Sequence, residues 1–255
     1  KLMKKIAIIG AGISGLFIAN LFKKNSNYQV TDYEKSLSIN LDEGYGIQLS
    51  VNSVKLLNQI GFDKFKNDQK FNPDKINFYS IKSSSKICDL NISDYNSANC
   101  KYTTLKRSEL VKFLKKDLEN VIKINHSISK IVQQNRKIQL IFENNVTSEC
   151  DHLIISDGVF SKSKSLILEN QTPPRYNKTL AIRGTIPISQ KINCRNISLF
   201  LGPDFHYVIY PVNQNGDLNF IAIMKYKLNK EEQKNQSLFN AVSYTHLRAH
   251  ETPRY

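Results

Sequence analysis

The chain has 255 residues and a formal net charge of +14, from 36 Lys and Arg against 22 Asp and Glu. This length suffices for one large or two modest domains with a hydrophobic core. No apolar run reaches the roughly 20 residues that span a bilayer, which predicts no transmembrane segment. The lysines are scattered and tryptophan is absent, so we attribute the charge to a solvated surface and expect no nucleic-acid partner. A weak attraction to anions remains an alternative, because Lys112, Lys115 and Lys116 form a basic cluster.

The cysteines indicate a reducing environment. Cys88, Cys100, Cys150 and Cys194 are widely spaced, with no C-x-x-C pair among them. This spacing favours reduced structural thiols in a cytoplasmic protein over a disulfide framework or a metal site.

The most specific motif follows a short apolar strand at residues 4–9. Gly10, Gly12 and Gly15 have the G-x-G-x-x-G spacing and lead into a predicted helix at 16–24. In this motif the first glycine makes a tight turn, the second admits a pyrophosphate, and the third allows close packing of helix on strand.

A secretory signal peptide is the competing interpretation of the N-terminal apolar run. We reject it because the glycines break the apolar run and no small-x-small cleavage site follows; Met3 is the expected initiator.

Glu34 completes the motif. It ends a predicted strand at residues 28–34 and follows Gly15 by roughly 20 residues, where a carboxylate binds a ribose. The alternative is an ordinary strand-end carboxylate. We predict nucleotide contacts from Ser14 and Lys35 as well.

The rest of the chain alternates between helical and strand patterns. A helix carrying Val54, Leu57 and Ile60 ends at Gly61, a good C-cap. Residues 107–118 form a third predicted helix, and a buried strand at 151–155 runs into Asp157-Gly158. Further strands are predicted at 75–81, 86–91, 121–124, 128–134, 137–142, 180–187, 197–201, 206–212 and 218–227. The order predicts an α/β fold with a Rossmann-like region, interleaved with a mainly antiparallel sheet.

Several further motifs occur in a fixed order along residues 3–230. They are Gly44 to Ser50 with Asn52, Leu57 and Gly61; Arg107 with Leu110; Asp157-Gly158 with Ser161 and Lys162; Arg183-Gly184; and Gly202-Pro203 with His206 and Tyr210 to Val212. Together with the glycine turn and Glu34, they resemble the single-component flavin-dependent aromatic hydroxylases, the group that includes salicylate and hydroxybenzoate hydroxylases.

The resemblance implies a domain organisation and a cofactor site. Residues 3–72 and 106–172 would form an FAD-binding domain, and residues 73–105 and 173–241 a substrate domain that is incomplete. The residues implied to bind FAD are Gly10, Gly12, Ser14, Gly15, Glu34, Lys35, Arg107, Asp157 and Gly158. In the family the Asp-Gly motif also serves NAD(P)H, the expected co-substrate.

The reaction implied by the resemblance is a monooxygenation. NAD(P)H reduces bound FAD, the reduced flavin captures O2 as a flavin hydroperoxide, and one oxygen atom passes to a small aromatic or related ring. Two alternatives stay open: an FAD-dependent oxidase or reductase of the same fold, and an inactive truncated fragment.

The chain also departs from the family pattern. Lys162 and Lys164 replace arginines, so a bidentate fork is lost, and Ile182 stands where an aromatic residue is usual. The family's third cofactor motif, a Gly-Asp segment, lies further on than this chain extends. We interpret Gly216-Asp217 as a hairpin turn instead.

Two single residues have competing interpretations. Arg107 begins a helix, where a cation opposes the macrodipole, so it is either a tolerated surface residue or one held for an anion. His206 is either a half-buried strand histidine, the commoner case, or a general base or donor for the substrate. It is the one candidate for a catalytic residue.

The C-terminal segment is treated separately. Residues 242–255 resemble the translation of a sequencing-library adapter, and we predict a non-native tail after a natural sequence that is cut near Ala241. His246 and His250 are therefore not read as metal ligands.

Overall fold

The computed structural model describes residues 3–39, 41, 45–168, 177–187, 194–227, 229, 231 and 248–251. By its contacts the chain divides into two units, Lys1–Leu41 with Leu110–Arg175, and Asp42–Glu109 with Tyr176–Tyr255. Both units are discontinuous in sequence, because each is interrupted by a segment of the other.

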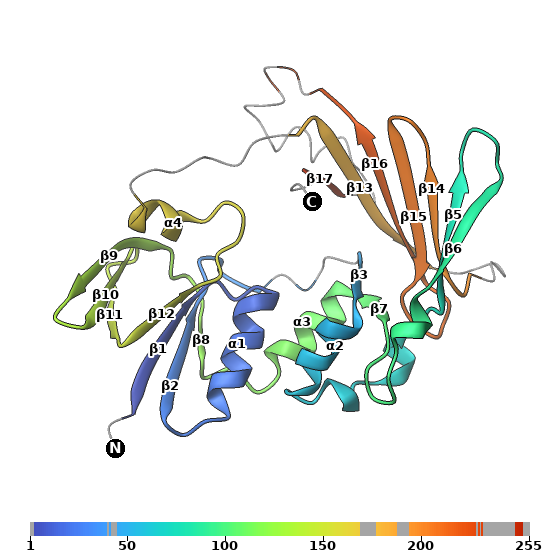
Figure 1. Ribbon diagram of the computed structural model, residues 1–255. Helices are drawn as coiled ribbons and strands as arrows, with labels where there is room; N and C mark the ends of the chain where they lie inside the picture. The colour runs from blue at the N-terminus through green and yellow to red at the C-terminus, as the bar shows by residue number, and fades with distance from the viewer. Residues whose placement is uncertain are drawn as a thin grey trace. The chain divides into compact units, whose positions relative to one another are not determined.

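The first unit contains a parallel sheet of four strands in the order β12-β1-β2-β8 (Figure 1). Its strands are β1 (Lys4–Ile9), β2 (Tyr28–Tyr33), β8 (Ile122–Lys123) and β12 (His152–Ile155). β1 pairs with β2 on one side and with β12 on the other, and all of these pairings are parallel. Because β1 lies between β2 and β12, the segments that follow these three strands meet at one edge of the sheet.

Helix α1 (Ile13–Lys23) follows β1 directly and packs on β2. The opposite side of the sheet carries a three-stranded antiparallel layer of β9 (Ile128–Gln134), β10 (Lys137–Phe142) and β11 (Thr147–Cys150). A core cluster joins the two sheets, and its members include Ala7, Ile9, Tyr33, Leu140 and Phe142. A short helix α4 (Lys162–Ile167) follows β12, and its N-cap Ser161 accepts a hydrogen bond from the Lys164 N–H at 2.9 Å.

The second unit is built on a seven-stranded sheet in the order β17-β13-β16-β15-β14-β5-β6. Its strands are β5 (Lys75–Ser80), β6 (Lys86–Asn91), β13 (Thr179–Ile186), β14 (Ile197–Leu201), β15 (Phe205–Pro211), β16 (Leu218–Lys225) and β17 (Arg248–Glu251). All neighbours in this sheet are antiparallel except β14 and β5. The strands predicted at residues 75–81 and 86–91 are confirmed as β5 and β6, which pair as an antiparallel hairpin.

A smaller sheet of the second unit has the order β3-β7-β4. It consists of β3 (Gly46–Leu49), β4 (Lys70–Phe71) and β7 (Thr103–Lys106), with α2 (Val51–Asn58) following β3. Ser50 caps α2 with its side chain, and Gly61 beyond the helix has φ +95°. Helix α3 (Arg107–Lys115) follows β7, and the division between the units falls within it. Three short 3-10 helices also belong to this unit, at Phe62–Lys64, Asn67–Gln69 and Ile92–Tyr95.

The two contact-based units do not coincide with the expected domains, whose bounds stay a prediction. We expected residues 3–72 to form one continuous part of the FAD-binding domain, yet residues 42–72 cluster with the second unit. The reason is long-range pairing: β3 and β4 both pair with β7, and the buried Asn219 side chain accepts a hydrogen bond from the Gly46 N–H.

The C-terminal segment was expected to have no role in the fold. The structure pairs β17 with β13 at the edge of the large sheet, from Arg183↔Arg248 to Leu180↔Glu251. Residues 242–247 and 252–255 lie outside the described part of the chain. No helix among the described residues is long and apolar enough to cross a membrane.

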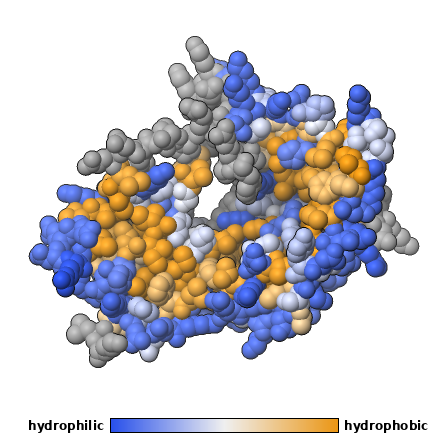
Figure 2. Space-filling model, viewed as in Figure 1, coloured by the Kyte–Doolittle hydropathy of each residue, from blue (hydrophilic) through white to orange (hydrophobic). Residues whose placement is uncertain are grey.

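Large hydrophobic side chains are exposed in both units. Figure 2 shows hydrophobic surface over the part of the first unit that carries α4 and over strands of the large sheet. The exposed apolar residues around α4 are Ile155, Val159, Phe160, Ile167 and Leu168. They flank Asp157-Gly158, so the edge of the parallel sheet that carries this motif has an apolar rim.

Candidate functional site

A pocket of about 510 Å³ lies at the edge of the parallel sheet where β1, β2 and β12 end. Six of the residues predicted to bind a nucleotide line it: Gly10, Gly12, Glu34, Lys35, Asp157 and Gly158. All of them belong to the first unit. The carboxyl edge of a parallel α/β sheet is where ligands bind in this fold class.

Gly10 and Gly15 form the tight part of the turn between β1 and α1. Gly10 has φ +105°, and a Cβ added to it would lie 2.6 Å from the Ser156 carbonyl oxygen. A Cβ on Gly15 would lie 2.0 Å from the carbonyl oxygen of Gly10. A side chain is therefore excluded at both positions, as the motif predicts.

Gly12 has a different environment. It is the N-cap of α1, and a Cβ added to it would have no heavy atom within 4 Å. Its carbonyl accepts the first helical bond, from Leu16 N–H at 2.9 Å, so the amides of residues 13–15 have no acceptor within the helix. The open space at Gly12 and these amides together fit a bound anion. Ser14 is exposed in this first turn and does not line the pocket.

Glu34 follows β2 and contacts the glycine turn. Its Oε2 accepts a hydrogen bond from Ala11 N–H at 3.0 Å, and its Oε1 accepts one from Ser36 N–H at 2.9 Å. An ionised carboxylate has about four acceptor positions, so positions remain for ribose hydroxyls. Lys35, beside it, is exposed at the pocket wall.

Asp157 and Gly158 follow β12 on the other side of the pocket. The Ser163 N–H donates a hydrogen bond to Asp157 Oδ2 at 3.0 Å. Burial raises the pKa of Asp157, but hydrogen bonds from Ser161 and Ser163 outweigh it, and the net pKa lies below the usual value. Asp157 Oδ1 is buried with no hydrogen-bond partner. Such an orphaned acceptor fits a hydroxyl group of a ligand. Lys162, also in the pocket wall, forms an ion pair with Glu143.

The second unit holds Arg107 at the start of α3. Its guanidinium carbon lies 5.8 Å from the centre of the Tyr45 ring, and that of Arg183 in β13 lies 5.4 Å from the same centre. The Arg107 N–H also donates to the Tyr45 carbonyl at 2.9 Å. Two cations thus flank one aromatic ring. The Nε of Arg183 is buried and lacks a hydrogen-bond partner, so a donor remains available for an anionic or carbonyl group.

His206 lies on β15, half-buried, opposite Leu201 of β14 and Ile223 of β16. Strand β16 lies between His206 and the strand that carries Arg183. The position of His206 fits an ordinary strand histidine as well as a substrate contact, so its catalytic role stays a prediction.

The prediction for Gly216-Asp217 is confirmed. These residues form the turn between β15 and β16, where Gly216 has φ +93° and the Asp217 N–H donates to Asn213 Oδ1 at 3.0 Å. The Asp217 carboxylate is used in an ion pair with Lys106 at 2.6 Å. This Gly-Asp pair is therefore a structural turn.

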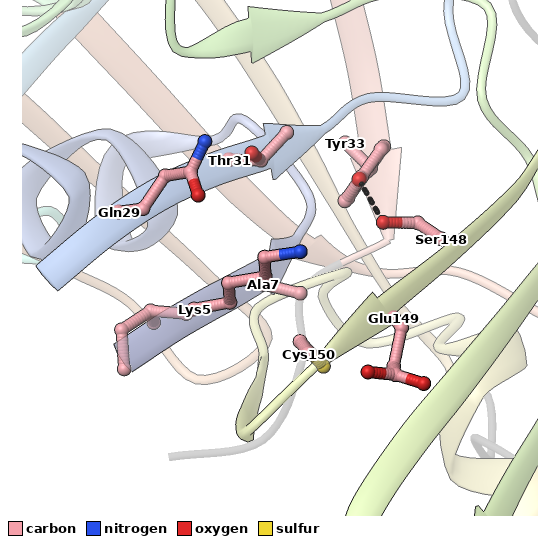
Figure 3. Close-up of a pocket in the computed structure, with 9 residues that line it drawn as sticks. Lys5, Ala7, Gln29, Thr31, Tyr33, Ser148, Glu149 and Cys150 are labelled. Carbon is pink, nitrogen blue, oxygen red and sulfur yellow. Dashed lines mark hydrogen bonds between the residues drawn. The ribbon is translucent and has the colours of Figure 1, made fainter. Parts of the chain in front are cut away.

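A second, smaller pocket of about 150 Å³ lies between the parallel sheet and strand β11 (Figure 3). Gln29, Thr31 and Tyr33 of β2 face it, together with Ser148 and Cys150 of β11. The Tyr33 hydroxyl donates to Ser148 Oγ at 2.7 Å, and burial raises the pKa of the Cys150 thiol to about 11. A thiol in this state is unreactive, so this pocket carries no evident chemistry.

Sequence reasoning missed the clustering of Tyr45 and Arg183 with Arg107, because it joins three distant segments. It also missed Phe160 and His126 as lining residues of the nucleotide pocket. Within the described ranges, no three His, Cys, Asp or Glu side chains are placed to hold a metal ion.

Comparison with known proteins supports the resemblance. No family model matches the chain. Salicylate hydroxylase of Pseudomonas putida is 25% identical over 237 residues, which is 86% of this chain and 54% of that protein. The 6-hydroxynicotinate 3-monooxygenase of Pseudomonas fluorescens is 26% identical over 186 residues, 72% of this chain and 48% of that protein.

A solved structure shares the fold. HpxO of Klebsiella pneumoniae, crystallised with FAD and uric acid, superposes with a TM-score of 0.81 at 16% identity, covering 98% of this chain and 68% of that one. The chain therefore shares its fold with that FAD-bound protein. It spans about half the length of the curated relatives that it matches.

Proposed function

We propose that this chain carries the FAD-binding site of a monooxygenase that uses NAD(P)H and O2 to hydroxylate a small aromatic or related ring. The observation that carries the proposal is the pocket at the edge of the parallel sheet. It combines a glycine turn open to an anion with two carboxylates, Glu34 and Asp157, on opposite walls. The curated relatives that hydroxylate aromatic rings support the reaction class.

The residues present fit FAD. A diphosphate requires a close approach to the backbone, and the space at Gly12 allows it, beside the first-turn amides of α1 that have no acceptor within the helix. The remaining acceptor positions of Glu34 suit the hydroxyls of the adenosine ribose, and the orphaned Oδ1 of Asp157 suits a further hydroxyl. Phe160 is 63% exposed at the pocket wall and offers an aromatic face to a planar ring.

The flavin, when bound, supplies the redox chemistry: acceptance of hydride from NAD(P)H and activation of O2 for transfer of one oxygen atom, with the other leaving as water. The protein binds and orients the cofactor and excludes water from it. We assign dinucleotide binding to Gly10, Gly12, Ser14, Gly15, Glu34, Lys35, Asp157 and Gly158, and a cofactor contact to Arg107.

The substrate is proposed to contact the second unit. Arg183 offers a buried Nε–H that lacks a partner, and its guanidinium is held against Tyr45. A small ring with an anionic or carbonyl substituent suits such a donor. His206 is proposed as a secondary contact.

The proposal places the enzyme in the cytoplasm. Cys88, Cys100, Cys150 and Cys194 are all free, as expected under reducing conditions.

Hydroxylation is tested with the product of the complete gene under labelled oxygen. Purified protein with FAD and NAD(P)H is screened against a panel of hydroxylated benzoates and pyridines under ¹⁸O2, and products are analysed by mass spectrometry. One ¹⁸O atom per product molecule supports the monooxygenase. Oxidation of NAD(P)H that yields only hydrogen peroxide with every ring tested would contradict it and favour an oxidase.

A further inference from the structure

Asp32 is the least expected side chain in the core of the first unit. It lies in β2, between Thr31 and Tyr33, and is 0% exposed. Thr31 and Tyr33 face the small pocket on the β11 side of the sheet (Figure 3). Since neighbouring residues of a strand point to opposite faces, Asp32 points to the α1 side. Its Oδ2 there lies 3.3 Å from the position that a Cβ on Gly15 would occupy.

Both carboxyl oxygens of Asp32 are buried without a hydrogen-bond partner. The charge that acts on this carboxyl is the carboxylate of Glu34, two residues further along the chain. The basic residues of the adjoining strands and helix occupy other positions in these elements. Lys4 and Lys5 pair with Tyr28 and Gln29 at the start of the strand, Lys123 of β8 pairs with Tyr33, and Lys23 ends α1.

A buried carboxylate without a partner is costly in its ionised form. Burial raises the pKa of Asp32 to about 7, with the negative charge of Glu34 as a second cause. The neutral and charged forms are therefore both accessible within the ordinary range of cellular pH.

Asp32 also lies directly behind the turn that faces the ligand. Gly15 belongs to the first turn of α1, where the helix amides have no acceptor within the helix. A diphosphate bound there brings two further negative charges to the same region. Like charges repel more strongly in a protein interior than in water, because the dielectric constant of the interior is lower.

We propose that Asp32 must carry a proton when this site holds a dinucleotide, so that binding of the diphosphate is coupled to proton uptake by this buried carboxyl. The inference rests on the proposed function of the pocket. Affinity for the dinucleotide then falls as the pH rises, because the free protein must regain a proton in order to bind. This coupling makes the retention of the cofactor depend on pH.

ADP-ribose is the probe, because it contains the diphosphate and adenosine of FAD and has no group that ionises between pH 6 and pH 8. Isothermal titration at the two pH values should show about tenfold weaker binding at pH 8, the limit for a single proton with a midpoint near 7. In Asp32→Asn the affinity should be equal at both pH values and close to that of the original protein at pH 6. His126→Asn, which removes an imidazole from the pocket wall, is the matched control, and it should retain the pH slope.

Proton uptake gives a second readout that needs no variant. Titrations near pH 7.5 in two buffers of different ionisation enthalpy should reveal net uptake of up to one proton per ADP-ribose bound. Binding that is unchanged between pH 6 and pH 8, or a slope that persists in Asp32→Asn, overturns the inference and leaves the proposed function intact. Absence of ADP-ribose binding at every pH overturns both.

Discussion

Glu34 is hydrogen-bonded to the glycine turn through Ala11, whose N–H donates to Glu34 Oε2 at 3.0 Å. This contact links the end of β2 to the loop between β1 and α1. It holds the carboxylate at the wall of the nucleotide pocket, beside the open space at Gly12. Glu34, predicted as a ribose ligand from its spacing after the glycines, thus lies in the wall of the pocket beside the glycine turn.

Replacing Glu34 by Gln should weaken dinucleotide binding without unfolding the protein. The amide oxygen can still accept from Ala11, but the charge-assisted bonds to ribose are lost, at about 1.5–3 kcal/mol. We expect roughly 10- to 100-fold weaker binding of FAD or ADP-ribose by calorimetry. Glu119→Gln, on an exposed residue of the same unit, is the control and should bind as the original protein does. Equal affinity in both variants would remove the ribose role from Glu34.

Substitutions of Gly15 and Gly12 should distinguish an effect on folding from an effect on ligand binding. Gly15→Ala places a Cβ 2.0 Å from the Gly10 carbonyl oxygen, and we expect it to lower Tm by more than about 5 °C. Gly12→Ala meets no atom of the protein within 4 Å, so its Tm should be nearly unchanged while the methyl group blocks the approach of the diphosphate. Thermal unfolding and ADP-ribose titration of both variants check this. Normal binding by Gly12→Ala would place the phosphates elsewhere.

Asn219→Ala should destabilise the second unit. The Asn219 side chain is fully buried and accepts a hydrogen bond from Gly46 N–H. Its loss leaves a buried amide without a partner, which costs about 1–3 kcal/mol in the free energy of unfolding. Urea unfolding measures the effect. Asn215→Ala, at an exposed turn position, should change the free energy by less than about 0.5 kcal/mol; a similar loss in both variants would argue against a special role for Asn219.

Asp32 should also make the stability of the ligand-free protein depend on pH. Its folded pKa is raised to about 7 by burial and by Glu34, so the unfolded chain releases this proton at lower pH than the folded protein does. Stability therefore falls as the pH rises from about 4 to 7, by up to about 1.4 kcal/mol per pH unit from this group. Urea unfolding at pH 5, 6 and 7 should show this decline, and Asp32→Asn should reduce its slope. An identical slope in the variant would indicate that Asp32 is ionised in the folded state.

Much of the fold could be predicted because its signals are local. The predicted bounds of the strands at residues 128–134, 137–142 and 197–201 agree with the structure, since β-branched or other apolar residues recur along each of these short segments. The strand Thr147–Cys150 was missed because it is largely polar, with Cys150 its one buried residue. The strand Gly46–Leu49 is specified by pairing with β7, which sequence spacing does not reveal.

The same distinction holds for the candidate site. Gly10, Gly12 and Glu34 were predicted because one continuous segment contains the whole motif. The cluster of Tyr45 with Arg183 depends on segments far apart in sequence. Asp32 was overlooked because an acid in a strand looks like a surface residue until its burial is known.

The pocket at the end of β1 and β2 is proposed to bind the adenine dinucleotide part of FAD. Isothermal titration of ADP-ribose into the purified chain at pH 6, beside the Gly12→Ala variant, measures this binding. We predict saturable binding with one site per chain, and its loss in Gly12→Ala with an unchanged Tm. No binding by the original chain, or equal binding by both proteins, would show that the dinucleotide does not bind at this glycine turn.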